Sequence, residues 1–477
     1  MGLKRKLGVQ DIVIYERGSN VGGTWNERPQ GSQKEIQDYW RTLTHRFDVQ
    51  RHIAFNRLVT GAQWDLAQNL WKVKTVSAAN SGKAPEPTTT TVTAKILITA
   101  VGILDSPRFP AISGIDSFKG TIFHSAQWRA DVDLSGKRVA VIGNGASAYH
   151  SVRADYSAGP YDASHQLLSD AKLAMQPHSA PAKWAFRNIP FVLRIHRFML
   201  FIFFEIFYLM IFSNKTRWFV AYIKAHAPAE YHDHLIPKYE LGCKRIIFDT
   251  NYFASLHQPN HNLNLDGIAE ITGNGIRTKT SENLPFDVII LATGFVAVGS
   301  SLFPTGKHVQ TSFHIFQDKF IVPIRGASGQ TIQYDAEGFP QAYKGTSVPG
   351  FPNMFMIAGP NTTTGHTSVT LFEELQVEYI LRLIKPVLFL SPESSPLALS
   401  VSRTANTAYN VWLHARLERS VHTGCASWYR TGADSKGKIS SIFPGSATLF
   451  WWHLRTVQWG DYVVHGDGRA LTKYLWK

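Results

Sequence analysis

The segment 138–148, RVAVIGNGASA, limits the fold of this chain more than any other. A short apolar run passes directly into Gly143-x-Gly145-x-x-Ala148, with Ser147 just before the last position. This spacing is typical of a parallel strand that turns tightly into a helix whose N-terminus holds a pyrophosphate. Because the motif follows an apolar strand and carries the permitted Ala at its third position, it predicts a nucleotide-binding βαβ unit.

Two further segments share the pattern of a buried strand that ends at a small residue and a glycine. They are ILITAVG (96–102) and VIILATG (288–294), one on each side of the glycine motif. Continuous apolar runs of this kind are typical of strands covered on both faces of a parallel sheet. The pair indicates a chain that passes twice between two nucleotide-binding domains.

The chain opens within a βαβ unit. Residues 2–8, GLKRKLG, are predicted to be the last turn of a helix that stops at Gly8. DIVIYE (11–16) is predicted to be a buried parallel strand, with Glu16 in the position of the acid that takes a ribose hydroxyl. The glycine turn expected before such an acid would fall before Met1, which indicates either a truncated gene model or a domain that has lost its central strand.

Composition excludes several classes of protein. With 477 residues, 44% hydrophobic and 18% charged, the chain is expected to be globular and to form two to four domains at roughly 150 residues each. The net charge of +14 is not gathered in one arm or one helix, so no nucleic acid partner is expected. Cys243 and Cys425 lie far apart, which predicts neither a disulfide framework nor a metal-binding pair and fits a reducing compartment.

The basic excess is densest at 181–225, where seven Lys and Arg residues accompany the single acid Glu205. The same stretch contains FMLFIFFEIFYLMIF (198–212), which is shorter than the roughly 18 to 20 apolar residues that cross a bilayer. We interpret it as a core helix of an inserted subdomain. The alternative is a cationic patch that lies on a membrane while an apolar molecule enters the protein.

The N-terminal residues contain neither the apolar run of a secretory signal nor, because Lys6 takes its place, the Ser or Thr of a myristoylation site. A cytoplasmic or peripherally membrane-associated protein is therefore expected.

Five motifs follow one another in a characteristic order. They are GGTW (22–25), Phe118-x-Gly120-x-x-x-His124-x-x-x-Trp128, GNGASA (143–148), LATGF (291–295) and GPN (359–361). Together they resemble the class B flavoprotein monooxygenases, and the histidine-containing motif resembles their Baeyer–Villiger branch. The resemblance extends from Val9 to about Trp428.

The resemblance implies an α/β fold with two Rossmann-like dinucleotide-binding domains, in which an NADP domain is inserted into an FAD domain. The implied boundaries are 1–105 and 286–395 for the FAD domain, 106–285 for the NADP domain with a helical insertion at about 181–236, and 396–477 for a C-terminal extension. FAD is expected to contact Glu16, Gly22, Gly23, Thr24, Trp25, Gly102, Thr293, Gly294 and Asn361. NADP(H) is expected to contact Gly143, Asn144, Gly145, Ala146, Ser147 and Ala148.

The segment LGCKRIIFDTNYFASL (241–256) resembles the active-site segment of the family and places the catalytic arginine at Arg245. The chemistry implied is that NADPH reduces the flavin, the reduced flavin activates O2, and one oxygen atom enters next to a ketone carbonyl to give an ester or lactone. A guanidinium never loses its charge, so Arg245 suits the stabilisation of developing negative charge, although an ordinary ion-pairing arginine is the alternative. The expected partners are O2 and an apolar ketone of aryl or polyketide type from secondary metabolism.

Several aromatic residues and histidines have more than one interpretation. Phe118, Gly120 and Trp128 belong to the motif of His124, which is either a conformational latch, a hydrogen-bonding group beside the nicotinamide, or a structural histidine. His366 is expected near the flavin or in a turn. Trp428 is expected in the substrate pocket or in a core.

The chain departs from the family pattern at three places. The first Gly-x-Gly-x-x-Gly and the segment that normally follows GGTW are missing, and the basic residue that would bind the NADP phosphate is not recognisable in 149–180. These departures resemble mispredicted exons. Two other functions remain open: an N- or S-oxygenating flavin monooxygenase, and a non-catalytic nucleotide-binding remnant. A disulfide reductase is excluded because no close cysteine pair is present.

Overall fold

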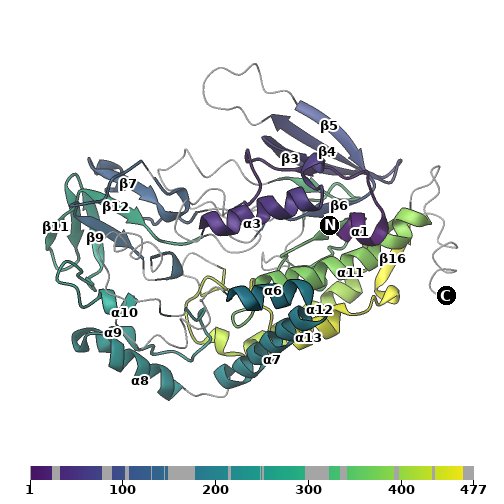
Figure 1. Cartoon of the computed structure of the whole chain (residues 1–477). Helices are drawn as coiled ribbons and strands as arrows, with labels where there is room; N and C mark the ends of the chain where they lie inside the picture. The colour runs from purple at the N-terminus through teal and green to yellow at the C-terminus, as the bar shows by residue number, and fades with distance from the viewer. Residues whose placement is uncertain are drawn as a thin grey trace.

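The computed structural model shows an α/β protein that combines parallel sheets, antiparallel sheets and a large helical layer (Figure 1). It describes residues 2–23, 33–77, 89–102, 107–129, 131–143, 145–148, 178–212, 216–247, 249, 252–295, 322–332, 341–390, 397–431 and 436–465. The predicted cofactor contacts of Thr24, Trp25 and Asn144 lie outside the described residues.

A three-stranded parallel sheet carries the glycine motif. Its strands are β7 (Thr121–His124), β12 (Val288–Leu291) and β8 (Val139–Ile142), in the order β7-β12-β8. Ile289 and Ile290 of the central strand have no exposed surface. Because both faces of β12 are covered, this strand is apolar at every position. The glycine motif follows directly from the carboxyl end of β8.

An antiparallel sheet packs beside it. Its strands are β9 (Ile268–Thr272), β10 (Gly275–Thr278) and β11 (Asn283–Pro285). Ile271 and Ile276 of this sheet share one apolar cluster with Ile289 and Leu291 of β12.

Two separate pairs of parallel strands contain the other predicted strand segments. The first pair is β1 (Ile14–Tyr15) with β2 (Ile53–Ala54), and the second is β6 (Leu97–Thr99) with β14 (Met354–Met356). The prediction that 11–16 form a buried strand is wrong, since Val13 and Ile14 are 57% and 41% exposed. The physical reason is that β1 has a neighbour on one side only among the described strands.

A four-stranded sheet lies next to the second pair. It consists of β13 (Ile324–Arg325), β3 (Arg57–Asp65), β4 (Leu70–Ser77) and β5 (Thr89–Ala94), in that order. Buried and exposed residues alternate along β4, as in a sheet with one covered face. Trp71 of β4 is fully buried and its indole Nε1 donates to the carbonyl oxygen of Pro352 at 2.8 Å, which joins this sheet to β14.

The N-terminal helices flank these strands. α1 (Gly2–Leu7) ends at Gly8, which has a positive φ of 67°, as the sequence predicts. α1 packs against α11 (Val369–Phe389), and the basic α3 (Gln33–Arg46) follows the described part of the N-terminal turn.

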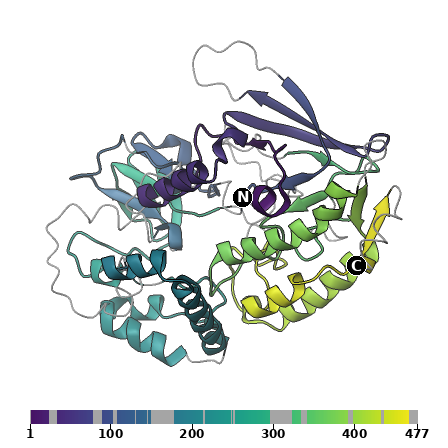
Figure 2. The ribbon, with the colours of Figure 1, turned by 45° about the vertical axis from the view of Figure 1, so that its right-hand side comes forward.

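The largest apolar core is built from the C-terminal part of the chain together with α11 (Figure 2). Its other elements are β15 (Ala398–Val401), α12 (Arg403–Glu418), α13 (Ala447–Leu454) and β16 (Tyr462–His465). Phe372 of α11 stacks on Phe450 of α13 with the ring centroids 4.3 Å apart. The C-terminal segment is therefore part of the main body, because its helices complete the cover of α11.

Short 3-10 turns connect several of these elements. They are η1 (Gln50–His52), η2 (Ile115–Ser117), η3 (Ser125–Gln127), η4 (Ala229–Tyr231), η5 (Val421–Thr423) and η6 (Trp459–Asp461).

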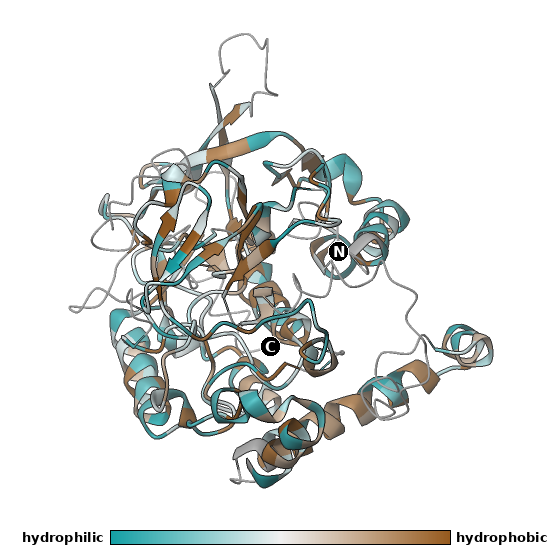
Figure 3. Ribbon diagram, turned by 90° about the vertical axis from the view of Figure 1, so that its left-hand side faces the viewer, coloured by the Kyte–Doolittle hydropathy of each residue, from teal (hydrophilic) through white to brown (hydrophobic). Residues whose placement is uncertain are grey.

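A row of helices follows one edge of the molecule (Figures 1 and 3). They are α6 (Ala180–Asn188), α7 (Val192–Phe212), α8 (Thr216–His226), α9 (His232–Leu235) and α10 (Tyr252–Ser255). Phe201 of α7 packs on the C-terminal core, whereas Phe198, Phe203 and Leu209 are 60%, 59% and 66% exposed. The interpretation of 198–212 as a core helix is therefore wrong for the outer face of α7. Among the described helices, none combines the length and apolarity needed to cross a membrane.

A disulfide bond joins Cys243 to Cys425. The expectation that the two cysteines would stay unpaired in a reducing compartment is therefore wrong. Separation in the sequence is a poor guide here, because the fold brings the two Cα atoms within 6.1 Å of each other.

Candidate active site

Arg245 lies in an irregular segment between α9 and α10. Its Nη1 donates to the carbonyl oxygen of Thr364 at 3.2 Å, although the residue as a whole is exposed. A guanidinium carries five N–H donors in a planar fork, so one anchoring bond fixes its position and leaves donors for another oxygen atom. This contact brings the arginine of the active-site segment to the GPNTTTGHTS segment (359–368).

The loop that receives Arg245 also contains a buried histidine. His366 is 8% exposed, and its Nδ1 lies 3.1 Å from the hydroxyl oxygen of Thr364. Burial lowers the pKa of His366 to about 4, so the ring is neutral at pH 7. The ring of Tyr208, from α7, lies 4.6 Å from the His366 ring. Arg245 therefore supplies the positive charge at this loop, while His366 and Tyr208 supply neutral polar rings.

Glu205 connects this loop to the C-terminal core. Its carboxylate accepts the backbone N–H groups of Ala447 at 2.9 Å and Thr448 at 3.2 Å, at the start of α13. Burial raises the pKa of Glu205, but hydrogen bonds from Thr448, Ser446 and the Ala447 amide outweigh that effect and leave the pKa lowered. One carboxylate oxygen also lies 3.8 Å from His366 Nε2. Glu205 thus binds the positive end of the α13 dipole and holds α7 against the loop.

Glu205→Gln is expected to lower the free energy of unfolding at pH 7 by about 1–2 kcal/mol, because an amide NH2 replaces one oxygen that accepts a backbone N–H. Because the pKa of Glu205 is lower in the folded protein than its ordinary value of 4.5, the ionised carboxylate stabilises the fold at pH values above 4.5. This stabilisation is lost as the pH falls through the folded-state pKa. Urea unfolding curves of variant and wild type should therefore converge in acid. Glu374→Gln is the control. Glu374 is exposed and forms an ion pair with Arg197, and such a surface pair contributes less than about 1 kcal/mol to stability. Equal losses in the two variants would contradict the role of Glu205.

The turn after β8 has the shape that a dinucleotide phosphate requires. Gly143 has a φ of +138°, and a Cβ there would lie 2.4 Å from the carbonyl oxygen of Ala292. A Cβ at Gly145 would meet nothing within 4 Å. Residues 146–148 begin a helix behind this open glycine, and Ala148 is buried against the protein. The described residues therefore fit the pyrophosphate of NADP(H), with backbone N–H groups as its ligands.

The turns assigned to FAD are also open. Gly23, Gly102 and Gly294 have positive φ values of 49°, 77° and 78°, and a Cβ at any of them would meet nothing within 4 Å. Gly22 also has a positive φ, of 123°. Glu16 Oε1 accepts the backbone N–H of Gly18 at 2.7 Å, which leaves Oε2 to accept a ribose hydroxyl. Backbone of this kind allows a flat cofactor to approach closely, so these residues fit FAD.

Residues 107–108, which follow the first predicted crossing (96–102) in the sequence, lie beside the end of the second (288–294). Gly294 accepts the backbone N–H of Arg108 at 2.9 Å, and the Thr293 hydroxyl donates to the carbonyl oxygen of Arg108. Pro107 and Phe295 form an antiparallel bridge next to them. The hydroxyl of Thr293 therefore ties these two segments together.

His124 lies at this junction. It is 1% exposed, and its Nδ1 accepts the backbone N–H of Ala126 at 3.0 Å. Its ring is 5.3 Å from that of Phe109, after the first crossing, and 6.2 Å from that of Phe295, after the second. A ring in contact with both segments has the position that a conformational latch requires.

The other residues of the His124 motif serve packing. A Cβ at Gly120 would lie 2.5 Å from the carbonyl oxygen of Asp287, so only glycine fits. Phe118 packs on the apolar cluster around β12, and the Trp128 ring meets the Phe123 ring edge-on at 5.4 Å.

The Asn361 side chain forms hydrogen bonds within the protein. Its Nδ2 donates to the carbonyl oxygens of Ile439 and Ile442, both at 3.1 Å, and the residue is 3% exposed. The side chain thus pins the GPN turn to the C-terminal core. Its contact with FAD stays a prediction.

Sequence reasoning missed Glu205, Tyr208 and Thr364 as members of the site. The signal for Glu205 was present, since it is the single acid in a long apolar run and has to find polar partners when that helix packs. Trp428 packs on the C-terminal core, 4.6 Å from the fully buried Tyr429, which supports its interpretation as a core residue.

Known proteins are similar to this chain in sequence and in fold. Residues 30–161 match the family model described as flavin-binding monooxygenase-like. The FAD-binding monooxygenase ktnD of Aspergillus niger is 30% identical over an alignment covering 98% of this chain and 80% of that protein. A Baeyer–Villiger monooxygenase of Pseudomonas aeruginosa is 29% identical over an alignment that covers 95% of this chain and 86% of that protein.

Among solved structures, OTEMO in complex with FAD and NADP is 23% identical, with a TM-score of 0.74 over 97% of this chain and 96% of that one. This likeness confirms the predicted α/β fold with two dinucleotide-binding domains. The motif order, the arginine beside the GPN segment and the similarity to ktnD lead to one conclusion: the chain belongs to the class B flavin-binding monooxygenases, in their Baeyer–Villiger branch.

Proposed function

We propose that this enzyme binds FAD and NADPH and inserts one oxygen atom of O2 next to the carbonyl of an apolar ketone, giving an ester or lactone. The observation that carries the proposal is the contact of Arg245 with the Thr364 carbonyl, which places a permanent charge at the loop beside the predicted FAD site. Bound flavin supplies the reduction and activation of O2. The residues of this chain supply binding, orientation and charge.

Arg245 is the proposed catalytic residue. Negative charge develops on the ketone oxygen during oxygen transfer, and a fixed guanidinium stabilises it without reorganisation. His366 is neutral, so it adds no second positive charge beside Arg245. A neutral imidazole carries a proton on one ring nitrogen only. Tyr208, from α7, places its ring 4.6 Å from the His366 ring.

The test is paired measurement on purified protein supplied with FAD. NADPH consumption and the gain of one oxygen by a test aryl ketone are followed together. Ester formation supports the proposal, whereas oxidation of a tertiary amine or a thioether without ester formation would favour the N- or S-oxygenating alternative. Absence of flavin absorbance after gel filtration in the presence of FAD would favour a non-catalytic nucleotide-binding protein.

We also propose the division into an FAD domain (1–105 and 286–395), an NADP domain (106–285) with a helical insertion at about 181–236, and a C-terminal segment (396–477). The adjacent segments 107–108 and 293–295 support it, because a domain inserted into another needs its two connections to lie side by side. An aryl or polyketide-type ketone from secondary metabolism is the proposed substrate class, which the aromatic content of 12% supports.

A further proposal is that α6–α8 hold the enzyme against an anionic lipid surface. The outer face of α7 exposes Phe198, Phe203 and Leu209, while Glu205 is turned inward to α13. Exposed basic residues lie within α7 and on the neighbouring helices α6 and α8: Lys183, Arg187, Arg194, Arg217 and Lys224. An apolar stripe bordered by basic residues is the pattern of a helix that lies in a membrane interface, with an apolar ketone dissolved beside it.

Flotation with vesicles is expected to carry the wild type upward with phosphatidylcholine–phosphatidylserine vesicles and much less with phosphatidylcholine alone. The double variant Phe198→Glu, Phe203→Glu should lose flotation, because two charges would have to enter the lipid. Leu66→Glu is the matched control, since Leu66 is 64% exposed on the β3–β4 turn, away from α7. Self-association that the double variant abolishes, without flotation, would identify the face as a contact between two copies and overturn the lipid proposal.

A further inference from the structure

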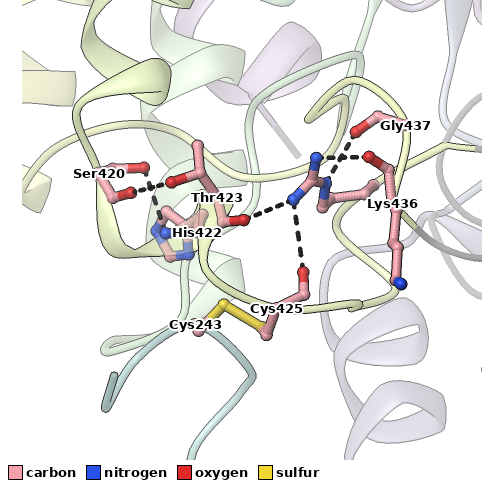
Figure 4. The surroundings of a disulfide bond; sticks show 8 residues. Cys243, Ser420, His422, Thr423, Cys425, Lys436 and Gly437 are labelled. Atoms are coloured by element: carbon pink, nitrogen blue, oxygen red, sulfur yellow. Dashed lines mark hydrogen bonds between the residues drawn. A yellow bond between two sulfur atoms is a disulfide. The ribbon is translucent and has the colours of Figure 1, made fainter. Parts of the chain in front are cut away.

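The disulfide lies next to the proposed catalytic arginine. Cys243, two residues before Arg245, is fully buried and bonded to Cys425, which follows η5 (Figure 4). The bond therefore connects the active-site segment, on the side of the helical row, to a loop of the C-terminal core.

The Cys425 end of this bond is held firmly. The Arg430 side chain donates to the carbonyl oxygens of Thr423 and Gly437, both at 2.8 Å, and reaches the Cys425 carbonyl at 3.5 Å (Figure 4). Tyr429, the residue before Arg430, has no exposed surface. Cys425 is thus part of a loop fixed from two sides.

The Arg245 end has no helix or strand of its own among residues 237–247. The backbone N–H of Cys243 bonds to Glu240 at 3.1 Å, which closes a local turn only. Its long-range contacts include the disulfide, the Arg245 bond to Thr364, and the buried His422 ring beside the carbonyls of Gly242 and Cys243. The segment therefore takes its position from the C-terminal core and not from regular secondary structure.

We propose that the Cys243–Cys425 disulfide positions Arg245, so that its reduction separates NADPH oxidation from oxygen insertion. The inference rests on the proposed function. Reduction by a dithiol such as dithiothreitol transfers two electrons and two protons: the sulfur–sulfur bond breaks, two protein thiols form, and the reductant closes its own disulfide. Cys425 is the partly exposed member of the pair, so attack from that side is open. Once released, Arg245 keeps its charge but loses its fixed place.

Two measurements on the full chain test this inference. Thiol titration under denaturing conditions should find no free thiol in the oxidised protein and two after reduction, since the chain has only two cysteines. Trypsin cleavage after the exposed Lys244 or Arg245 should be several-fold faster in the reduced protein, while cleavage after Lys224 in α8 keeps its rate. Peptide masses identify the cleavage sites. This readout does not depend on catalysis.

The catalytic readout is the amount of ester formed per NADPH consumed. Reduction is expected to lower this ratio about tenfold or more, with hydrogen peroxide released instead, because small misplacements of a catalytic group cost up to about 10²-fold. Flavin reduction by NADPH should keep its rate. The double variant Cys243→Ser, Cys425→Ser should behave as the reduced wild type and should not respond to dithiothreitol.

The outcomes are distinguishable. If the oxidised wild type forms no ester, the proposed function fails, and the trypsin result still reports on the disulfide. If ester forms with the same ratio to NADPH in both redox states, the positioning role is overturned while the function stands. Two free thiols in protein purified under air would also overturn it.

Discussion

Arg245→Ala is expected to lower the rate of ester formation by about 10²- to 10³-fold, the usual cost of removing one preorganised donor from a developing negative charge. NADPH consumption should persist at a reduced rate, with hydrogen peroxide as the product. Arg245→Lys should recover part of the ester formation, since it restores the charge but not the planar fork that binds Thr364. Paired assays of NADPH loss and oxygen gain by the ketone measure both effects.

Lys244→Ala is the matched control for this experiment. Lys244 is the adjacent exposed cation, and its Nζ lies 4.9 Å from the centroid of the Tyr239 ring, away from Thr364. Its removal changes the net charge of the segment by the same amount, so it should leave the ratio of ester to NADPH unchanged. If Arg245→Ala still converts the ketone at near the wild-type rate, Arg245 is a structural residue and the proposed mechanism is wrong.

Gly143→Ala is expected to destabilise the protein and to abolish NADPH use. A Cβ at this position would lie 2.4 Å from the Ala292 carbonyl, and the φ of +138° suits glycine only. Backbone strain and overpacking each cost about 1–3 kcal/mol, so the free energy of unfolding should fall by several kcal/mol. Urea unfolding followed by circular dichroism measures the stability, and NADPH oxidation measures the function.

Gly145→Ala separates cofactor binding from folding. A Cβ there would meet nothing within 4 Å, so the stability of the protein should stay within about 1 kcal/mol of the wild type. The KM for NADPH should rise, because the added methyl group occupies the space into which the pyrophosphate comes. A KM equal to that of the wild type would show that the cofactor does not approach this turn.

The elements that depend on neighbouring residues could be predicted from the sequence. The strand–glycine–helix pattern at 138–148 predicted β8, the tight turn and the helix that follows. The apolar run at 288–291 predicted the buried central strand β12, and Gly8 predicted the end of α1. These patterns are reliable because backbone dihedral angles and two-sided burial are set within a few residues of the chain.

Burial was harder to predict than secondary structure. Val13 and Ile14 have the composition of a buried strand, yet they are exposed because burial depends on which strands lie beside them. Apolar residues occur on both faces of α7, and Glu205 indicates in the sequence that one face needs polar partners but not which segment supplies them. Glu205 settles the orientation of that helix only when the N-terminus of α13 is there to bind it.

What the sequence by itself determined is the family and the order of the strands and turns; the catalytic role of Arg245 stays a prediction. What only the tertiary structure decided is which distant segments meet: Arg245 with Thr364, Glu205 with the start of α13, and Cys243 with Cys425, separated by 119, 242 and 182 positions. A local pattern specifies the conformation of a few residues. The pairing of distant residues follows from how the whole core packs, and no single segment contains that information.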